Sequence, residues 1–154
     1  MTYAAKQMSA FLTELRSLGV PLPDWFWAIP MSDRIADCNG IGSDDPSVKW
    51  LVEPTTFVFS WMEVAAVPHD EFWSRWYNDG SRARFKESNS MFLHILLAKA
   101  DRSFRWCFFG PLRESLRAGR REEAHAAHAI LSSDGCFDIW KKNAVVEPGP
   151  EAMA

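Results

Sequence analysis

The chain has 154 residues, which is enough length for one domain with a sizeable core. Its formal net charge is −3, and 24% of its residues are charged. Hydrophobic residues make up 47% and include eight Trp and eleven Phe, so we expect most large rings to lie in the core. No apolar run approaches the roughly 18 residues of a membrane span. Three cysteines, an odd number, exclude a complete disulfide framework within the chain.

The first twenty residues do not have the pattern of a signal peptide. Lys6, Glu14 and Arg16 interrupt any apolar stretch, and no small-residue cleavage site follows. From this and the odd number of cysteines we expect a cytoplasmic protein.

The small net charge hides a strong asymmetry along the chain. Residues 1–79 carry 5 basic and 11 acidic side chains, residues 80–121 carry 10 and 3, and residues 122–154 carry 2 and 6. The basic middle is compatible with packing against the acidic half, with simple solvation, or with a nucleic-acid or anionic lipid partner. Of these we favour packing or solvation.

In chain order, the first predicted element is an amphipathic helix whose apolar residues recur every three or four positions. These residues are Met8, Phe11, Leu12, Leu15 and Leu18. Gly19 is expected to end this helix, and Asp24 to cap a short aromatic one. Pro30 divides the aromatic helix from a second piece that reaches about Asp37. The sequence CNGIGSDDP, residues 38–46, predicts a loop.

The next apolar stretch is ambiguous. Val48, Trp50 and Val52 alternate as in a short strand, which leaves room for one short β-hairpin, and residues 57–67 fit either a strand or a helix. Pro68 suits the first turn of a helix, where no intrahelical N–H is required. We expect that helix to end near Gly80.

Residues 82–131 are predicted to be mostly helical, so we expect an all-α fold class with a single helical domain over residues 1–143. A long helix over residues 82–99 carries one stripe made of Phe85, Asn89, Phe92 and Leu96. A further helix is predicted over residues 101–131, with a break at Gly110-Pro111. The tail 144–154, rich in Pro, Gly and Ala, is predicted to be disordered.

Three short motifs occur in an order typical of one enzyme family. CNGIGS occupies residues 38–43, PHDEFW residues 68–73, and SNSMFL residues 88–93. Together they resemble the phospholipase A2-like proteins, particularly compact bacterial and phage-encoded members with an NGCG-type loop, an HD dyad and an ADxxF helix. The resemblance implies a helical domain with long loops that hydrolyses phospholipid esters with the help of Ca²⁺.

The resemblance also assigns roles to individual residues. His69 takes the position of the general base, a task that suits an imidazole near neutral pH. Asp70, with the backbone carbonyls of Gly40 and Gly42, takes the position of the Ca²⁺ ligands, since calcium prefers oxygen donors. Asn89 stands where the family has the aspartate that orients the histidine. An amide oxygen still accepts a hydrogen bond there, but it carries no negative charge.

Other features depart from the family pattern or allow a different interpretation. Ile41 replaces a loop cysteine, and Trp73 replaces the usual tyrosine. His69-Asp70 also fits an ordinary helix N-terminus, where acidic side chains are favoured. The alternative function is a non-enzymatic binding protein that docks a protein or nucleic-acid partner through its segregated acidic and basic faces.

Basic residues and aromatic rings interleave in residues 102–121. We expect the rings there to form a core stripe and the arginines a solvated face. The alternative is that this segment contacts nucleic acid or an anionic membrane surface.

Overall fold

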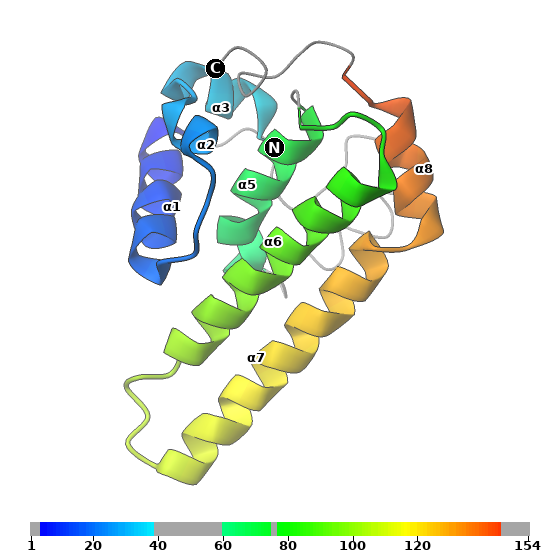
Figure 1. The fold of residues 1–154 in the computed structure, drawn as a ribbon. Coiled ribbons are helices and arrows are strands. Elements are labelled where there is room, and N and C mark those ends of the chain that lie inside the picture. The colour runs from blue at the N-terminus through cyan, green and yellow to red at the C-terminus, as the bar shows by residue number, and fades with distance from the viewer. Residues whose placement is uncertain (1–3, 39–59, 75–76, 146–154) are drawn as a thin grey trace.

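The computed structural model describes residues 4–38, 60–74 and 77–145, and no strand occurs among them (Figure 1). In chain order the elements are α1 (Ala5–Leu18), α2 (Asp24–Ala28), α3 (Met31–Asp37), a 3₁₀ turn η2 (Ser60–Met62), α5 (Glu63–Ser74), α6 (Arg82–Arg102), α7 (Gly110–Leu131) and α8 (Asp134–Lys142). The predicted all-α class is confirmed. The predicted strand and hairpin around residues 48–52 lie outside the described residues. None of these helices is long and apolar enough to cross a membrane.

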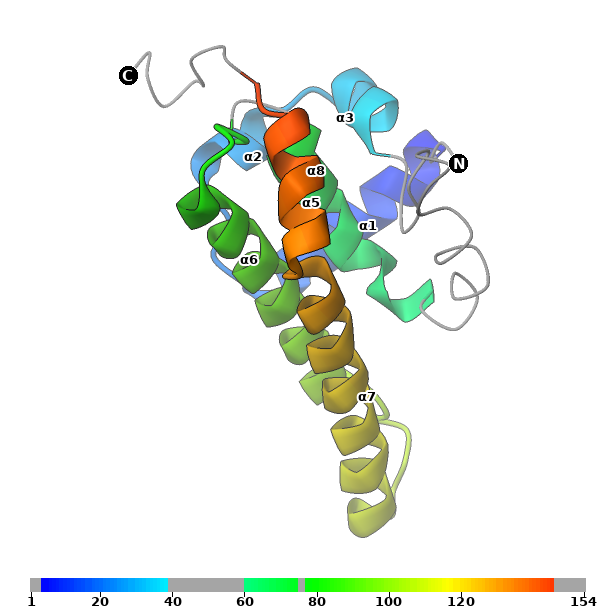
Figure 2. The same ribbon diagram turned by 90° about the vertical axis from the view of Figure 1, so that its right-hand side faces the viewer.

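Helix α5 lies at the centre of the arrangement. It packs against α1 and α3 on one side and against α6 on the other (Figure 1). Helices α6 and α7 form a long antiparallel hairpin, whose connecting loop projects away from the other helices in both views (Figures 1 and 2). Helix α8 contacts α6 near the opposite end of that hairpin.

Aromatic side chains form much of the core, as expected from the composition. The largest fully buried side chains include Trp140, Phe26, Phe72 and Phe85. The ring of Phe85 lies 5.8 Å from that of Trp140, so this contact joins α6 to α8. Each such ring removes a large apolar surface from water and adds edge-to-face contacts.

The N-terminal helices largely follow the predicted boundaries. Gly19 ends α1 in the left-handed conformation with φ 65°, and its N–H donates to the carbonyl of Arg16. Asp24 was predicted as the cap of α2, but the cap position is held by Pro23 and Asp24 is the first helical residue. An acidic side chain in the first turn still interacts favourably with the helix dipole.

The predicted position of Pro68 in a first helical turn is wrong. Helix α5 begins at Glu63, so Pro68 lies in its interior and gives the helix one hydrogen bond fewer. Val64, one turn before the proline, and Val67, directly before it, are fully buried. Burial of such side chains stabilises by about 1.5–3 kcal/mol each, enough to offset an interruption that costs about 3 kcal/mol.

The end of α5 also differs from the prediction: the helix is described as far as Ser74, and residues 77–79 are not helical, so it ends before Gly80. The fully buried Asn78 follows, and its amide nitrogen lies 3.0 Å from the carbonyl oxygen of Trp140 and 3.1 Å from that of Asn143. The backbone carbonyl of Asn78 accepts a hydrogen bond from the N–H of Val145 at 2.7 Å. Asn78 therefore joins the turn after α5 to the end of α8. Residues 146–154 of the predicted disordered tail lie outside the described residues.

The C-terminal half is divided differently from the prediction. No helix starts near Asp101, because α6 continues through Arg102. The expected break at Gly110-Pro111 is the start of α7, where proline fits the first turn. Helix α8 was not predicted, and the side chain of Ser133 caps it by accepting from the N–H of Cys136.

The basic segment is partly neutralised within the fold. Lys99 pairs with Glu14 of the acidic half at 2.8 Å, which agrees with the expected packing between the two halves. Other pairs lie within the α6–α7 hairpin or link it to α8, such as Arg121 with Asp101 at 2.6 Å and Arg82 with Asp134 at 2.9 Å. Exposed pairs of this kind contribute little individually to stability.

Candidate functional site

Two of the predicted site residues meet across the interface of α5 and α6. His69 Nε2 lies 3.3 Å from Asn89 Oδ1. Asn89 is buried at 1% exposure, whereas the side chain of His69 is 11% exposed. The stripe predicted on residues 82–99 places Asn89 on the face of α6 that packs against α5, one turn from the buried Phe85 and Phe92. The histidine therefore has a fixed partner and retains some access to solvent.

The third helix of this site, α7, fixes the orientation of the Asn89 amide. Asn89 Nδ2 donates to the carbonyl of Leu131, the last residue of α7, at 3.1 Å. A carbonyl only accepts, so the amide nitrogen faces Leu131 and the amide oxygen faces His69. Nε2 of the imidazole is then the donor, and Nδ1 of the neutral ring carries the lone pair.

Aromatic side chains confine the imidazole ring. Trp73, one turn along α5, lies 5.2 Å from it between ring centroids and is tilted by 34°. Phe92 of α6 approaches edge-on at 5.4 Å. Trp73 continues into the core through an edge-to-face contact with Trp140 at 5.2 Å. These contacts hold the His69 ring in one plane, as a positioned acid or base requires.

Asp70 lies on the Nδ1 side of the imidazole. Its Oδ1 atom is 3.8 Å from His69 Nδ1, and the two side chains are 17% and 11% exposed, respectively. That separation exceeds hydrogen-bond length, so Asp70 does not fix the imidazole as Asn89 does. The arrangement places one carboxylate and one ring nitrogen with a lone pair side by side.

A buried ion pair lies next to Asp70 along α5. Glu71 is fully buried, and its Oε1 atom lies 3.8 Å from Arg34 Nη1 of α3. Arg34 also donates to the carbonyl of Phe26 and lies over the Phe26 ring at 4.1 Å. The pair ties α3 to α5, so it supports the helix that carries His69.

Cys38, the first residue of the CNGIGS motif, is anchored against this same region. Its Sγ lies 3.6 Å from the carbonyl oxygen of Val67 and 3.8 Å from Glu71 Oε1. Burial, followed by the negative charges of Asp70 and Glu71, raises the pKa of the Cys38 thiol far above its ordinary value. Cys38 is therefore a protonated packing residue and no nucleophile.

The structure thus brings together His69, Asp70 and Asn89 of the predicted site. Gly40 and Gly42, the predicted carbonyl donors, lie outside the described residues. Within the described ranges no group of three or more His, Cys, Asp or Glu side chains is placed to hold a metal ion. The chain enters the glycine-containing motif from Cys38, which contacts the residue after Asp70.

Several residues that shape the site were not identified from the sequence. The Leu131 carbonyl orients Asn89 through the backbone, so no side-chain pattern marks it. The buried pair of Arg34 and Glu71 joins residues that are far apart in the chain. Phe92 could have been identified from the sequence, because it lies on the same predicted stripe as Asn89.

Comparison of this chain with protein-family models, with curated proteins and with solved structures finds no match.

Proposed function

We propose that the protein is a phospholipase A2-like hydrolase that cleaves phospholipid ester bonds with the help of Ca²⁺. The observation that carries the proposal is the hydrogen bond of His69 Nε2 to an amide whose orientation is fixed by Leu131. This bond leaves Nδ1 of the neutral ring as a base, on the side where Asp70 lies. The order of the three sequence motifs supports the same activity.

The proposed reaction uses His69 as a general base and then as a general acid. Nδ1 accepts a proton from water while the water oxygen forms a bond to the ester carbonyl carbon. The imidazolium then returns that proton to the leaving alkoxide as the carbon–oxygen bond breaks. The products are a fatty acid and a lysophospholipid, with His69 back in its neutral form.

Asn89 acts in this proposal as a positioning residue. Its amide oxygen holds the imidazole in the required tautomer, 3.3 Å from Nε2. An amide carries no net charge, so it stabilises the imidazolium less than a carboxylate does. We therefore expect slow turnover compared with a site that has aspartate at this position.

The proposed calcium site uses Asp70 together with the carbonyls of Gly40 and Gly42. The half-buried carboxylate of Asp70 supplies a hard oxygen ligand close to Nδ1 of His69, which fits the donor preference of Ca²⁺. When bound, the ion supplies a Lewis acid for the oxygen that becomes negative during attack. Cys38, the first residue of the glycine-containing motif, contacts Glu71 in the same part of α5, which supports this assignment.

Fatty-acid release from phospholipid–detergent mixed micelles in millimolar Ca²⁺ tests the proposal. His69→Ala should reduce the rate by about 100-fold or more, the usual contribution of a positioned base. His125→Ala is the matched control, because it removes an exposed histidine on α7 and should leave the rate unchanged. Equal rates for His69→Ala and the unaltered protein, both folded, would overturn the assignment.

The non-enzymatic alternative rests on the neutral Asn89 and on the basic α6–α7 segment. This alternative predicts that the unaltered protein does not hydrolyse phospholipid. It also predicts a binding affinity for polyanions that falls steeply as the salt concentration rises. The micelle assay and a salt-dependent binding measurement therefore separate the two functions.

A further inference from the structure

The loop between α6 and α7 and the first turn of α7 form the projecting end of the hairpin (Figures 1 and 2), and large apolar side chains are exposed there. Trp106 is 73% exposed, Phe108 96%, Phe109 76% and Leu112 54%. We call these four side chains the aromatic tip. The expectation that the rings of this segment form a core stripe is wrong for Trp106, Phe108 and Phe109. Their exposure requires another explanation, because clustered exposed apolar groups mark interaction surfaces.

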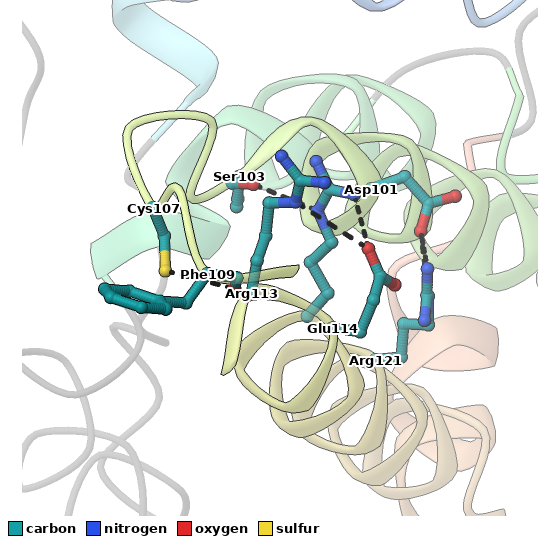
Figure 3. Close-up of polar contacts among 8 residues, drawn as sticks. Asp101, Ser103, Cys107, Phe109, Arg113, Glu114 and Arg121 are labelled. Carbon is teal, nitrogen blue, oxygen red and sulfur yellow. Dashed lines mark hydrogen bonds and ion pairs between the residues drawn. The ribbon is translucent and has the colours of Figure 1, made fainter. Parts of the chain in front are cut away.

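The loop that carries the aromatic tip is held by an internal polar network (Figure 3). Arg117 Nε donates to the carbonyl of Ser103 at 3.1 Å, and the same guanidinium pairs with Glu114 at 2.8 Å. Within the loop, the N–H of Cys107 donates to the carbonyl of Phe104 at 3.0 Å. The loop therefore has a defined conformation that keeps the rings exposed.

Two further features fix the direction of the loop. Cys107 is buried at 4% exposure, and its Sγ lies 3.6 Å from the carbonyl oxygen of Phe109 (Figure 3). Phe104 adopts a positive φ of 58°, a conformation that costs about 1–3 kcal/mol in a non-glycine residue. The buried Cys107 therefore lies between two exposed residues of the loop, Trp106 and Phe108.

The surroundings of the aromatic tip are positively charged. Residues 101–121 contain six arginines and two acidic residues, Asp101 and Glu114, so this part of the hairpin has a net positive charge. In the part of the chain that the structure describes, no carboxylate pairs with the exposed Arg105. Arg113 lies 3.9 Å from Glu114, so the unneutralised positive charge beside the exposed rings is that of Arg105. Aromatic rings beside a net positive charge are the combination found at interfaces with anionic lipid.

We propose that the aromatic tip inserts into the surface of an anionic phospholipid bilayer and anchors the protein there. The rings would enter the boundary between headgroups and acyl chains while the arginines contact lipid phosphates. A projecting tip suits insertion into a fluid layer, and its charge is complementary to that layer. The proposal shares its lipid with the proposed hydrolase function, but it requires no catalysis.

The anchor and the His69 site are separate parts of the molecule. Asn89 and Arg102 are thirteen residues apart on α6, which corresponds to about 20 Å along the helix. Anchoring through the aromatic tip therefore leaves the His69 site free. A variant that loses hydrolysis can keep membrane binding, and this separates failure of one proposal from failure of the other.

Co-sedimentation with vesicles of phosphatidylcholine and phosphatidylglycerol in equal parts tests the anchor. Trp106→Ser combined with Phe108→Ser should weaken vesicle binding by on the order of 100-fold, since two large apolar side chains no longer leave water. Ile130→Ser is the matched control, because Ile130 is 58% exposed on α7 but lies outside the tip. Arg105→Gln should weaken binding to the anionic vesicles and leave binding to pure phosphatidylcholine unchanged.

Three results would overturn the anchor. The first is recovery of the unaltered protein without vesicles, and the second is binding of the double variant as tight as that of the Ile130→Ser control. The third is a dimer in light scattering that is lost in the double variant, which would assign the tip to a second copy of the chain. Far-UV circular dichroism confirms the fold of each variant, and His69→Ala should bind vesicles as the unaltered protein does.

Discussion

Replacing Asn89 with Asp tests how the positioning residue limits the reaction. The Asn89 Oδ1 atom lies 3.3 Å from His69 Nε2, so a carboxylate at this position reaches the same nitrogen. A hydrogen bond to a charged group contributes about 1.5–3 kcal/mol, against about 0.5–1.5 kcal/mol for a neutral one. The difference of about 1–1.5 kcal/mol stabilises the transition state, in which the imidazole is protonated. This corresponds to an increase in kcat of about tenfold.

The same substitution should destabilise the fold. Asn89 Nδ2 donates to the carbonyl of Leu131 at 3.1 Å, and an aspartate has no donor to replace it. An unpaired buried polar group costs about 1–3 kcal/mol. Urea denaturation measures this loss, and the kcat of fatty-acid release from mixed micelles measures the gain. The two effects have opposite signs, so a general loss of structure cannot imitate them.

Ser90→Asp provides the control for the added charge. Ser90 is the next residue on α6 and is exposed, so it places a carboxylate on the same helix away from the imidazole. Both kcat and stability should change little in this variant. If Asn89→Asp loses stability as expected but hydrolyses no faster than the unaltered protein, His69 is not the base.

Three further predictions concern the surroundings of the site. Arg34→Met should lower the free energy of unfolding, measured by urea denaturation, by about 3–5 kcal/mol, because Glu71 is left charged and buried. Adding Glu71→Leu in the same chain should restore part of that loss. An unchanged free energy of unfolding would refute a structural role for the pair. Burial raises the pKa of Cys38, so in the folded protein this thiol stays protonated above its ordinary titration range. We therefore expect Cys136 to react with a thiol reagent at pH 8 much faster than Cys38. Calorimetric titration with Ca²⁺ should show binding that Asp70→Asn abolishes, and equal heats from both proteins would remove Asp70 from the calcium site.

The sequence predicted the face that builds the site better than the ends of the helices. The spacing of Phe85, Asn89, Phe92 and Leu96 placed these residues on one stripe of α6, and all four are buried. Helical periodicity depends on burial along the whole element, so the stripe is robust. The structure places His69 Nε2 3.3 Å from Asn89 Oδ1 on this stripe.

Helix boundaries depended on competing local effects that the sequence could not rank. Pro68 favours a first turn by itself, but the burial of Val64 and Val67 extends α5 back to Glu63. Helix α8 is short, and its start rests on a cap by Ser133 and on the burial of Trp140 against α6. Such tertiary contacts override local preference.

The aromatic tip shows the limit of composition as a guide to burial. Rings in a segment with periodic arginines normally indicate a core stripe, and this expectation failed for Trp106, Phe108 and Phe109. The reason is topological, because the loop between α6 and α7 lies beyond the reach of the other helices (Figure 2). Sequence periodicity gives no information about how far a hairpin projects.

The proposed role of His69 as a base depends on its tautomer, which nuclear magnetic resonance of the ¹⁵N-labelled protein measures directly. Long-range proton–nitrogen correlations distinguish the two ring nitrogens of the neutral imidazole. We expect a proton on Nε2, held by the Asn89 amide, and a lone pair on Nδ1 beside Asp70. A proton on Nδ1 of the neutral ring would contradict that role, because Nδ1 then has no lone pair with which to activate water.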